Sequence, residues 1–177
     1  LAEHIQQFAG AMQAQQETLR RVWLGKLFHL ENGTTGSLDP LINVIAKMPN
    51  LTSFYISGHS KALHIGEEAL KSLCHAPKLR YLGLHRFLLN PVLCKVLAEE
   101  LRTNTVLRQL SLRYATTGGG GATNVSNWDG NALVQMMEVN NTLKFVHLEG
   151  SKVGIEHNRK IQMFVKLNKA GRCHLYD

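Results

Sequence analysis

The side chains able to do chemistry are few and scattered along this 177-residue chain. His147 and Glu149 stand two residues apart, so on a strand they would share a face, as a general acid/base pair requires. Nothing in the surrounding sequence marks a nucleophile or a substrate pocket, and we interpret the pair as a surface contact. The four consecutive glycines at 118–121 lack the Lys-Ser/Thr that a phosphate-binding loop needs, so they predict a flexible loop. We therefore expect a protein that is not an enzyme.

Metal-binding residue types are present but widely separated. The only adjacent cysteine-histidine pairs are Cys74-His75 and Cys173-His174, which lie far apart in the sequence. Zinc needs clustered ligands, so we expect neither a metal nor another cofactor. Cys74 and Cys94 fall in helix-like segments and are expected to pack as small apolar groups. An odd count of three cysteines without short paired spacing favours a reducing intracellular compartment, either the cytoplasm or an organelle.

The composition is that of a globular protein with a basic balance. Apolar residues make up 44% of the chain, charged residues 19%, and the formal net charge is +7. A positive balance suits acidic proteins, nucleic acid or anionic membrane surfaces as partners, and does not choose among them. No apolar run approaches the roughly 18 residues that a membrane-spanning helix needs. Because the first residue already falls in a helix-like segment, we expect the chain to be part of a longer one.

The elements that would position these side chains come from one pattern that recurs five times: apolar, two variable, apolar, one variable, apolar. Its copies begin at Leu19, Leu51, Leu79, Leu107 and Leu143. The interval is 28 residues from Leu51 to Leu79 and again from Leu79 to Leu107, whereas the first and last intervals are longer. Insertion loops at 31–37 and 116–127, rich in glycine and small polar residues, account for the extra length.

A helix-like segment precedes each copy of the pattern. Residues 41–48, for example, carry apolar side chains at helical spacing. Asp39-Pro40 and Asn90-Pro91 each place a capping residue before a proline at the first helical position. Alternating short strands and helices give parallel strands, and so short a period is typical of a solenoid. The sequence predicts an α/β horseshoe of about five β-α repeats, with the parallel sheet concave and the helices convex.

Three segments, 76–84, 97–107 and 140–148, resemble the strands and helix-to-strand joints of leucine-rich-repeat proteins of the ribonuclease-inhibitor-like type. A fourth segment, 158–172, is similar to a closing segment of leucine-rich-repeat proteins from diatoms and related algae. The resemblance implies a single leucine-rich-repeat domain over residues 1–177, with a C-terminal capping helix that we place at 156–172.

The chain departs from that family at one position of the repeat. The family usually has Asn or Cys three residues after the last apolar position of the strand. This chain has Leu27, His59, Phe87, Ala115 and Ser151 there. We therefore expect the usual side-chain ladder at that position to be absent.

Strand alternation predicts which side chains face solvent from the concave side of the sheet, and this set is rich in aromatic, histidine and arginine residues. The predicted partner-binding residues are Trp23, Tyr55, Tyr81, His85, Arg113, Phe145 and His147. Exposed aromatic side chains are costly without a purpose, and Tyr, Trp and Arg are frequent interface anchors. The favoured function is a non-enzymatic protein-protein interaction module, or scaffold, that binds a partner on its concave face.

Four basic residues share the second position of the pattern and predict a stripe along one edge of the sheet. They are Arg20, Arg80, Arg108 and Lys144. The stripe would steer an acidic protein partner. Three alternatives stay open. The protein could bind RNA or another polyanion along the stripe. It could instead be a peripheral subunit of a larger complex, which includes membrane-bound complexes, or it could be an enzyme or enzyme activator that depends on His147.

Overall fold

The computed structural model describes residues 2–25, 36–58, 63–87, 89–115, 130–151 and 153–171. The main sheet has five parallel strands in the order β1-β3-β5-β6-β7. The strands are β1 (Arg21–Leu24), β3 (Ser53–Ser57), β5 (Tyr81–His85), β6 (Gln109–Ser111) and β7 (Phe145–His147). The helices of the described residues are α1 (Ala2–Gln13), α2 (Asp39–Ala46), α3 (Glu67–Cys74), α4 (Pro91–Arg102), α5 (Gly130–Val139) and α6 (Ile155–Lys169).

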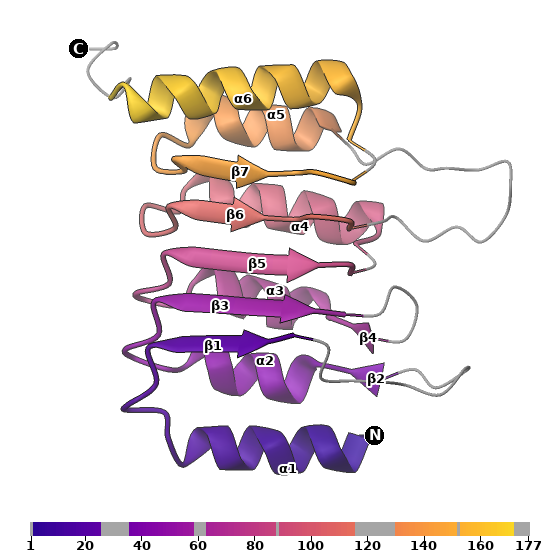
Figure 1. Cartoon of the computed structure of the whole chain (residues 1–177), viewed down its shortest axis with the longest axis vertical. Helices are drawn as coiled ribbons and strands as arrows, with labels where there is room; N and C mark the ends of the chain where they lie inside the picture. The colour runs from indigo at the N-terminus through magenta and orange to yellow at the C-terminus, as the bar shows by residue number, and fades with distance from the viewer. Residues whose placement is uncertain are drawn as a thin grey trace, which may run out of the picture.

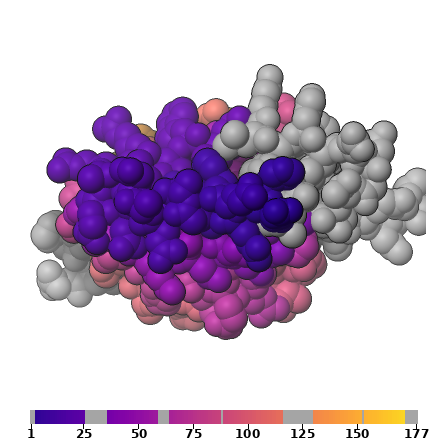
Figure 2. All heavy atoms as spheres, turned by 90° about the horizontal axis from the view of Figure 1, so that it is seen from below, coloured from indigo at the N-terminus to yellow at the C-terminus, as the bar shows by residue number. Residues whose placement is uncertain are grey.

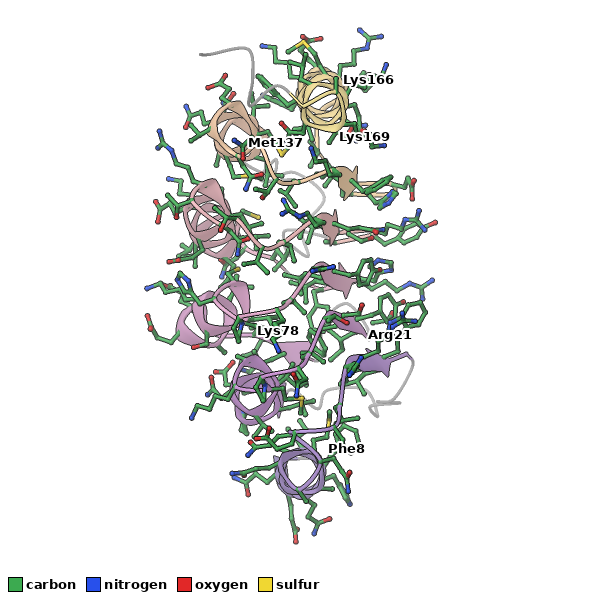
Figure 3. The ribbon with its side chains drawn as sticks, turned by 90° about the vertical axis from the view of Figure 1, so that its left-hand side faces the viewer. Phe8, Arg21, Lys78, Met137, Lys166 and Lys169 are labelled. Atoms are coloured by element: carbon green, nitrogen blue, oxygen red, sulfur yellow. The ribbon has the colours of Figure 1, made fainter. Side chains whose placement is uncertain are left out.

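Strands and helices form two layers that stack in chain order (Figure 1). Seen along the strands, the helices follow an outer arc and the strands an inner arc (Figure 3). The predicted solenoid, with a concave parallel sheet and convex helices, is therefore confirmed. Each helix packs against the next one along the chain, from α1 on α2 through to α5 on α6.

The strands are in register, so equivalent positions of successive repeats form straight rows across the sheet. One row runs through Arg21, Ser53, Tyr81, Gln109 and Phe145. Because neighbouring strands lie about 4.8 Å apart, residues one repeat apart in sequence come close enough to touch. This register sets which functional side chains meet.

The core lies between the sheet and the helices. The pattern residues Leu79, Leu82 and Leu84 are buried, and so are Leu70 and Leu73 on the preceding helix α3. Burying a leucine contributes about 2 kcal/mol, and the same set recurs in each repeat. Stacking of repeats thus supplies the apolar burial that one repeat alone could not.

Helices cover both ends of the described stack. At the N-terminal end α1 buries Ile5 and Ala9, and Figure 2 shows this helix lying across that end. At the other end α6 buries Ile161 and Val165. The Gln162 side chain on α6 also donates a hydrogen bond of 2.9 Å to the carbonyl oxygen of Val146, on the last strand. A terminal helix packed in this way is what the sequence predicts for the C-terminal cap.

The two predicted helix caps have different outcomes. Asn90 accepts a hydrogen bond of 2.8 Å from the Leu93 backbone N–H, which confirms it as the cap of α4. The prediction for Asp39 is wrong, because this residue is already helical and caps nothing on its own helix. Its carboxylate instead accepts a hydrogen bond of 2.7 Å from the backbone N–H of Gly66, just before α3. Asp39 thus ties two successive repeats together.

The end of the first predicted insertion loop is a short strand. Its last two residues form strand β2 (Gly36–Ser37), which pairs in parallel with β4 (Leu63–His64). The prediction of a loop is therefore wrong for residues 36 and 37. Residues 31–35 and the second predicted loop, 116–127, lie outside the described residues.

A buried asparagine holds the joint between α5 and β7. Asn140 is 2% exposed, and its amide group donates to the carbonyl oxygens of Leu101 (2.6 Å) and Asn104 (3.1 Å). Its side-chain oxygen accepts from the backbone N–H groups of Thr142 and Leu143, each at 2.9 Å. One side chain therefore satisfies four backbone groups from two successive repeats.

The same arrangement occurs on either side of this joint. Asn104 donates to the carbonyl oxygen of Cys74 (2.7 Å) and accepts from the backbone N–H of Leu107 (2.7 Å). Asn168, buried on α6, donates to the carbonyl oxygen of Asn140 (2.9 Å). Asn104, Asn140 and Asn168 together form an asparagine ladder that runs through the C-terminal half of the described stack.

In the leucine-rich-repeat family that the sequence resembles, such a ladder is expected at another position, three residues after the last apolar position of each strand. There the structure has the apolar side chains of Phe87 and Ala115, both buried, and Ser151, which donates to the carbonyl oxygen of Leu148. Leu27 and His59 lie outside the described residues. The repeats are therefore tied by side-chain hydrogen bonds after all, at the helix-to-strand joints.

Candidate functional site

The candidate site is the open face, which we define as the side of the five-stranded sheet that points away from the helices (Figure 3). The strand residues of the predicted site occupy its outward positions, and Arg113 lies two residues after the end of β6. Trp23 is 68% exposed and Phe145 is 44% exposed. Tyr55 and Tyr81 are half-buried. The predicted residues therefore share one face but separate into two groups.

The first group is an aromatic cluster made of Trp23, Tyr55, Tyr81 and His85. The ring centroids of Trp23 and Tyr55 lie 5.2 Å apart, and those of Trp23 and Tyr81 lie 6.5 Å apart. His85 meets Tyr55 edge-to-face at 4.7 Å. Contacts of this geometry contribute about 1 kcal/mol each beyond the area they bury. The cluster is thus held in place before any partner arrives.

Gly83 makes room for this cluster. A Cβ atom added at Gly83 would lie 2.8 Å from Cδ2 of Tyr55 and 2.9 Å from the hydroxyl oxygen of Tyr81. Both distances are too short for real contacts, so any larger residue would displace the tyrosine rings. The glycine in the middle of β5 therefore allows the rings of Tyr55, on β3, and Tyr81, on β5, to lie over this part of β5.

The second group is polar and lies at the C-terminal end of the sheet. Arg113 forms an ion pair with Glu149, and Nδ1 of His147 lies 3.9 Å from the same carboxylate. Nε2 of His147 lies 3.3 Å from the amide nitrogen of Gln109. His147 and Glu149 do share a face, as expected, but Arg113 holds the carboxylate. This arrangement is an ion-pair network on the surface of the sheet.

A hydrogen bond ties the aromatic cluster to β6, and burial keeps the cluster uncharged. Nε2 of His85 lies 2.7 Å from the hydroxyl oxygen of Ser111. Burial lowers the pKa of His85 below its ordinary value, and the positive charge of Arg113 lowers it further. Burial also raises the pKa of Tyr81. Both side chains are therefore neutral at pH 7.

A hollow of about 640 Å³ opens beside the aromatic cluster. Its lining residues are Arg21, Trp23, Ser53, Tyr81 and Gln109. All but Trp23 belong to one row of the sheet. Ser53 is the smallest of them and stands between Arg21 and Tyr81, so its short side chain forms the floor. The predicted site omitted Arg21, Ser53 and Gln109, although their place in the repeat could have indicated them.

The four residues of the predicted basic edge do fall in one row, which also includes Thr52, the residue before β3. Two of them are used inside the protein, because Nζ of Lys144 donates to the carbonyl oxygen of Asn168 and Nη1 of Arg108 donates to that of Thr142. Arg20, Arg80 and Arg108 are exposed, and Lys144 is half-buried. A role of this row in binding stays a prediction.

Phe145 contacts Lys169, a residue outside the predicted binding site. Nζ of Lys169, on α6, lies 4.0 Å from the centre of the Phe145 ring. Figure 3 shows Lys169 on the side of α6 that faces the sheet. A cation this close to an aromatic face contributes about 1 kcal/mol. Phe145 is therefore partly occupied within the chain, unlike Trp23.

No group of three or more His, Cys, Asp or Glu side chains in the described ranges is placed to hold a metal ion. In the same part of the chain, no helix has the length and apolar character needed to cross a membrane.

The fold and the layout of the open face define the class as a leucine-rich-repeat-like solenoid. The chain is similar to the C-terminal domain of tropomodulin from Caenorhabditis elegans, with a TM-score of 0.67 and 15% identity over 97% of this chain and 96% of that domain. It is also similar to leiomodin-1 actin-binding site 2, with a TM-score of 0.65 and 10% identity over 95% of this chain and 91% of that one. Identities this low show the fold alone. No protein-family model and no curated protein matches the sequence.

These neighbours correct the resemblance drawn from the sequence. The ribonuclease-inhibitor-like type and the algal leucine-rich-repeat proteins are wrong as relatives, because the similar structures are tropomodulin and leiomodin domains. The reason is physical: the spacing of apolar residues reports how a repeat packs, and many repeat proteins share that requirement. The pattern therefore predicts the solenoid and does not identify a type within it.

Proposed function

We propose that this protein is a non-enzymatic protein-interaction module that binds a partner on its open face. The observation that carries the proposal is the aromatic cluster, in which Trp23 is 68% exposed on an otherwise well-packed sheet. Exposed Trp and Tyr side chains side by side are typical of binding hot spots. The hydrogen-bonded His85 and the hollow beside Tyr81 add the polar surroundings that such sites have.

The cluster is suited to binding because little needs to be ordered when a partner arrives. Its rings rest on each other and on regular strands, so the loss of side-chain freedom on binding is small. A tryptophan exposes roughly 250 Å² when free, so covering the exposed part of Trp23 would contribute about 4 kcal/mol at 25 cal/mol/Å². That gain is large enough for one residue to anchor an interface.

Support for a protein partner also comes from the fold. One of the similar structures, leiomodin-1 actin-binding site 2, is described by the protein that it binds. Actin is therefore the first defined partner to test. The same experiment also detects two other outcomes. The first is an RNA bound along Arg20 and Arg80, and the second is that the protein is a subunit of a larger complex.

The test is affinity capture from an extract of the source cells, together with co-sedimentation with purified actin filaments. The test variant combines Trp23→Ala, Tyr55→Ala and Tyr81→Ala. The matched control changes three exposed or half-exposed side chains of α4 on the convex side: Lys95→Ala, Glu99→Ala and Arg102→Ala. Each extract is split and one half is treated with nuclease. Circular dichroism and thermal melting verify that every variant is folded.

We expect one or more proteins to be captured by the wild type and by the α4 control and to be lost with the aromatic variant. Gly83→Val gives a second variant that keeps every aromatic residue but displaces the rings, and it should lose the same proteins. Retention of all partners by both open-face variants would refute the proposal. Recovery that depends on nuclease treatment would replace it with the RNA function, and co-capture of a whole set of subunits would identify a complex.

A further inference from the structure

The hollow beside Trp23 has one charged group and no counter-charge. Arg21 is exposed, and it forms no ion pair with any residue in the part of the chain that the structure describes. Figure 3 shows its side chain projecting from the open face. The other lining residues of the hollow are neutral. The hollow is therefore positively charged at its β1 side.

The acid of the open face is at the opposite end. Among the described strand and strand-end positions, Glu149 is the carboxylate on this face, and it is already paired with Arg113. Arg21 lies on β1 and Glu149 follows β7, four strand spacings away, which is about 19 Å. Glu149 therefore cannot pair with Arg21, and among the described residues no other carboxylate pairs with this guanidinium.

Two aromatic rings flank this charge. The planes of Trp23 and Tyr81 are within 25° of each other, with centroids 6.5 Å apart. The exposed surface of Trp23 offers a flat apolar contact next to the guanidinium of Arg21. Ser53 at the floor and Gln109 at the far side are polar groups able to donate hydrogen bonds. The lining thus combines a cation, flat apolar surface and neutral donors.

We propose that this hollow binds a carboxylate of the partner protein, presented by an Asp or Glu whose neighbour in sequence is an aromatic or proline residue. The carboxylate pairs with Arg21 and accepts from Ser53 or Gln109, while the neighbouring ring lies on Trp23. The inference rests on the proposed function of the open face and names the chemistry of its partner. A single arginine favours a carboxylate over a phosphate, because phosphate recognition generally uses a cluster of arginines.

The test uses short synthetic peptides and the fluorescence of Trp23. The chain has two tryptophans, so Trp128→Phe leaves Trp23 as the reporter. The probe is the acetylated, amidated octapeptide Gly-Ser-Gly-Phe-Asp-Gly-Ser-Gly. Three matched peptides replace the Asp by Asn, the Asp by Lys, or the Phe by Ser. Calorimetry on the chain that retains both tryptophans verifies that the reporter substitution does not change the affinities.

We expect the Phe-Asp peptide to bind at least about fivefold more tightly than the Asn, Lys or Ser peptides. Arg21→Glu should abolish this preference and make the Lys peptide the better ligand. Arg102→Glu, on the convex helix α4, makes the same change in net charge and should leave the preference unchanged. A preference that follows Arg21 alone supports a carboxylate site in the hollow.

Three results would overturn the inference: equal binding of the Asp and Asn peptides, equal effects of Arg21→Glu and Arg102→Glu, or no response to any peptide at millimolar concentration. Its failure is distinguishable from failure of the proposed function. If captured partners depend on the aromatic cluster but stay bound to Arg21→Glu, only the carboxylate is wrong. If they do not depend on the aromatic cluster, the open face itself is not the binding site.

Discussion

Replacing Asn140 by alanine should destabilise the fold more than its small size suggests. The side chain is 2% exposed and makes hydrogen bonds with four backbone groups: the carbonyl oxygens of Leu101 and Asn104 and the N–H groups of Thr142 and Leu143. An alanine at this position can replace none of them. Water has little access to the joint, because Thr142 and Leu143 are also buried.

The size of the effect follows from counting the groups left without a partner. The carbonyl oxygen of Asn104 keeps a hydrogen bond of 2.9 Å from the hydroxyl of Thr142, so it stays satisfied. The carbonyl oxygen of Leu101 likewise keeps a hydrogen bond of 3.3 Å from the backbone N–H of Asn104. The groups left without a partner are therefore the N–H groups of Thr142 and Leu143. An unsatisfied buried group costs about 1 kcal/mol or more, so the two N–H groups should lower the free energy of unfolding of Asn140→Ala by about 2 kcal/mol.

Urea denaturation followed by far-ultraviolet circular dichroism measures this change directly. Asn141→Ala is the matched control, because this exposed neighbour should change the free energy of unfolding by less than about 0.5 kcal/mol. Asn140→Asp keeps the acceptor, removes the amide donor and places a charge beside two carbonyls, so it should cost at least as much as the alanine. A loss below about 1 kcal/mol for Asn140→Ala would refute the reasoning, since the joint would then be held by packing alone.

Three further predictions concern other parts of the chain. Gly150→Ala should lower the stability by about 2 kcal/mol in thermal unfolding, because Gly150 has a φ of 67° and an added Cβ would collide with the ring of Tyr114. The stability that His85 contributes should be lost as the pH falls from above the ordinary pKa of 6.5 through the lower pKa of His85 in the folded state, because the folded state binds fewer protons than the unfolded one. His85→Gln should reduce that slope in thermal unfolding, and an unchanged slope would contradict the assignment. The thiol of Cys74, whose pKa burial raises to about 12, should resist alkylation at about pH 8 until urea unfolds the protein, as mass spectrometry of labelled peptides would show.

The repeat made the fold predictable from the sequence. Leu51, Leu79 and Leu107 recur at a spacing that only a stacked strand-helix unit explains, and each is buried as the pattern requires. Strand alternation likewise placed Trp23 and Tyr55 on the open face. In both cases the position of a residue within its own strand decides whether its side chain is buried or faces solvent. The local sequence is therefore sufficient to predict the burial of that side chain.

Contacts between elements were harder to foresee. Lys144 was assigned to a basic edge, but its amine instead donates to the carbonyl of Asn168 near the C-terminal end of α6, where a helix attracts positive charge. The sequence does not reveal which strand residue that helix end will meet. The asparagine ladder was not predicted for a related reason. Asparagine occurs three residues before the strand pattern at Asn104 and Asn140, whereas Met48 and Ala76 occupy the equivalent positions of two other repeats.

The in-register rows have a consequence for how this surface could evolve. Trp23 lies beside Tyr55, and Tyr55 lies beside Gly83, because each repeat places the same position at the same height. Deleting the 28 residues 51–78 would bring Trp23 against Gly83 and dismantle the aromatic cluster in one genetic event. Since repeats contact mainly their neighbours, the repeats on either side of the deletion would pack directly against each other. Duplication or loss of a repeat could therefore exchange one partner for another faster than a series of point mutations.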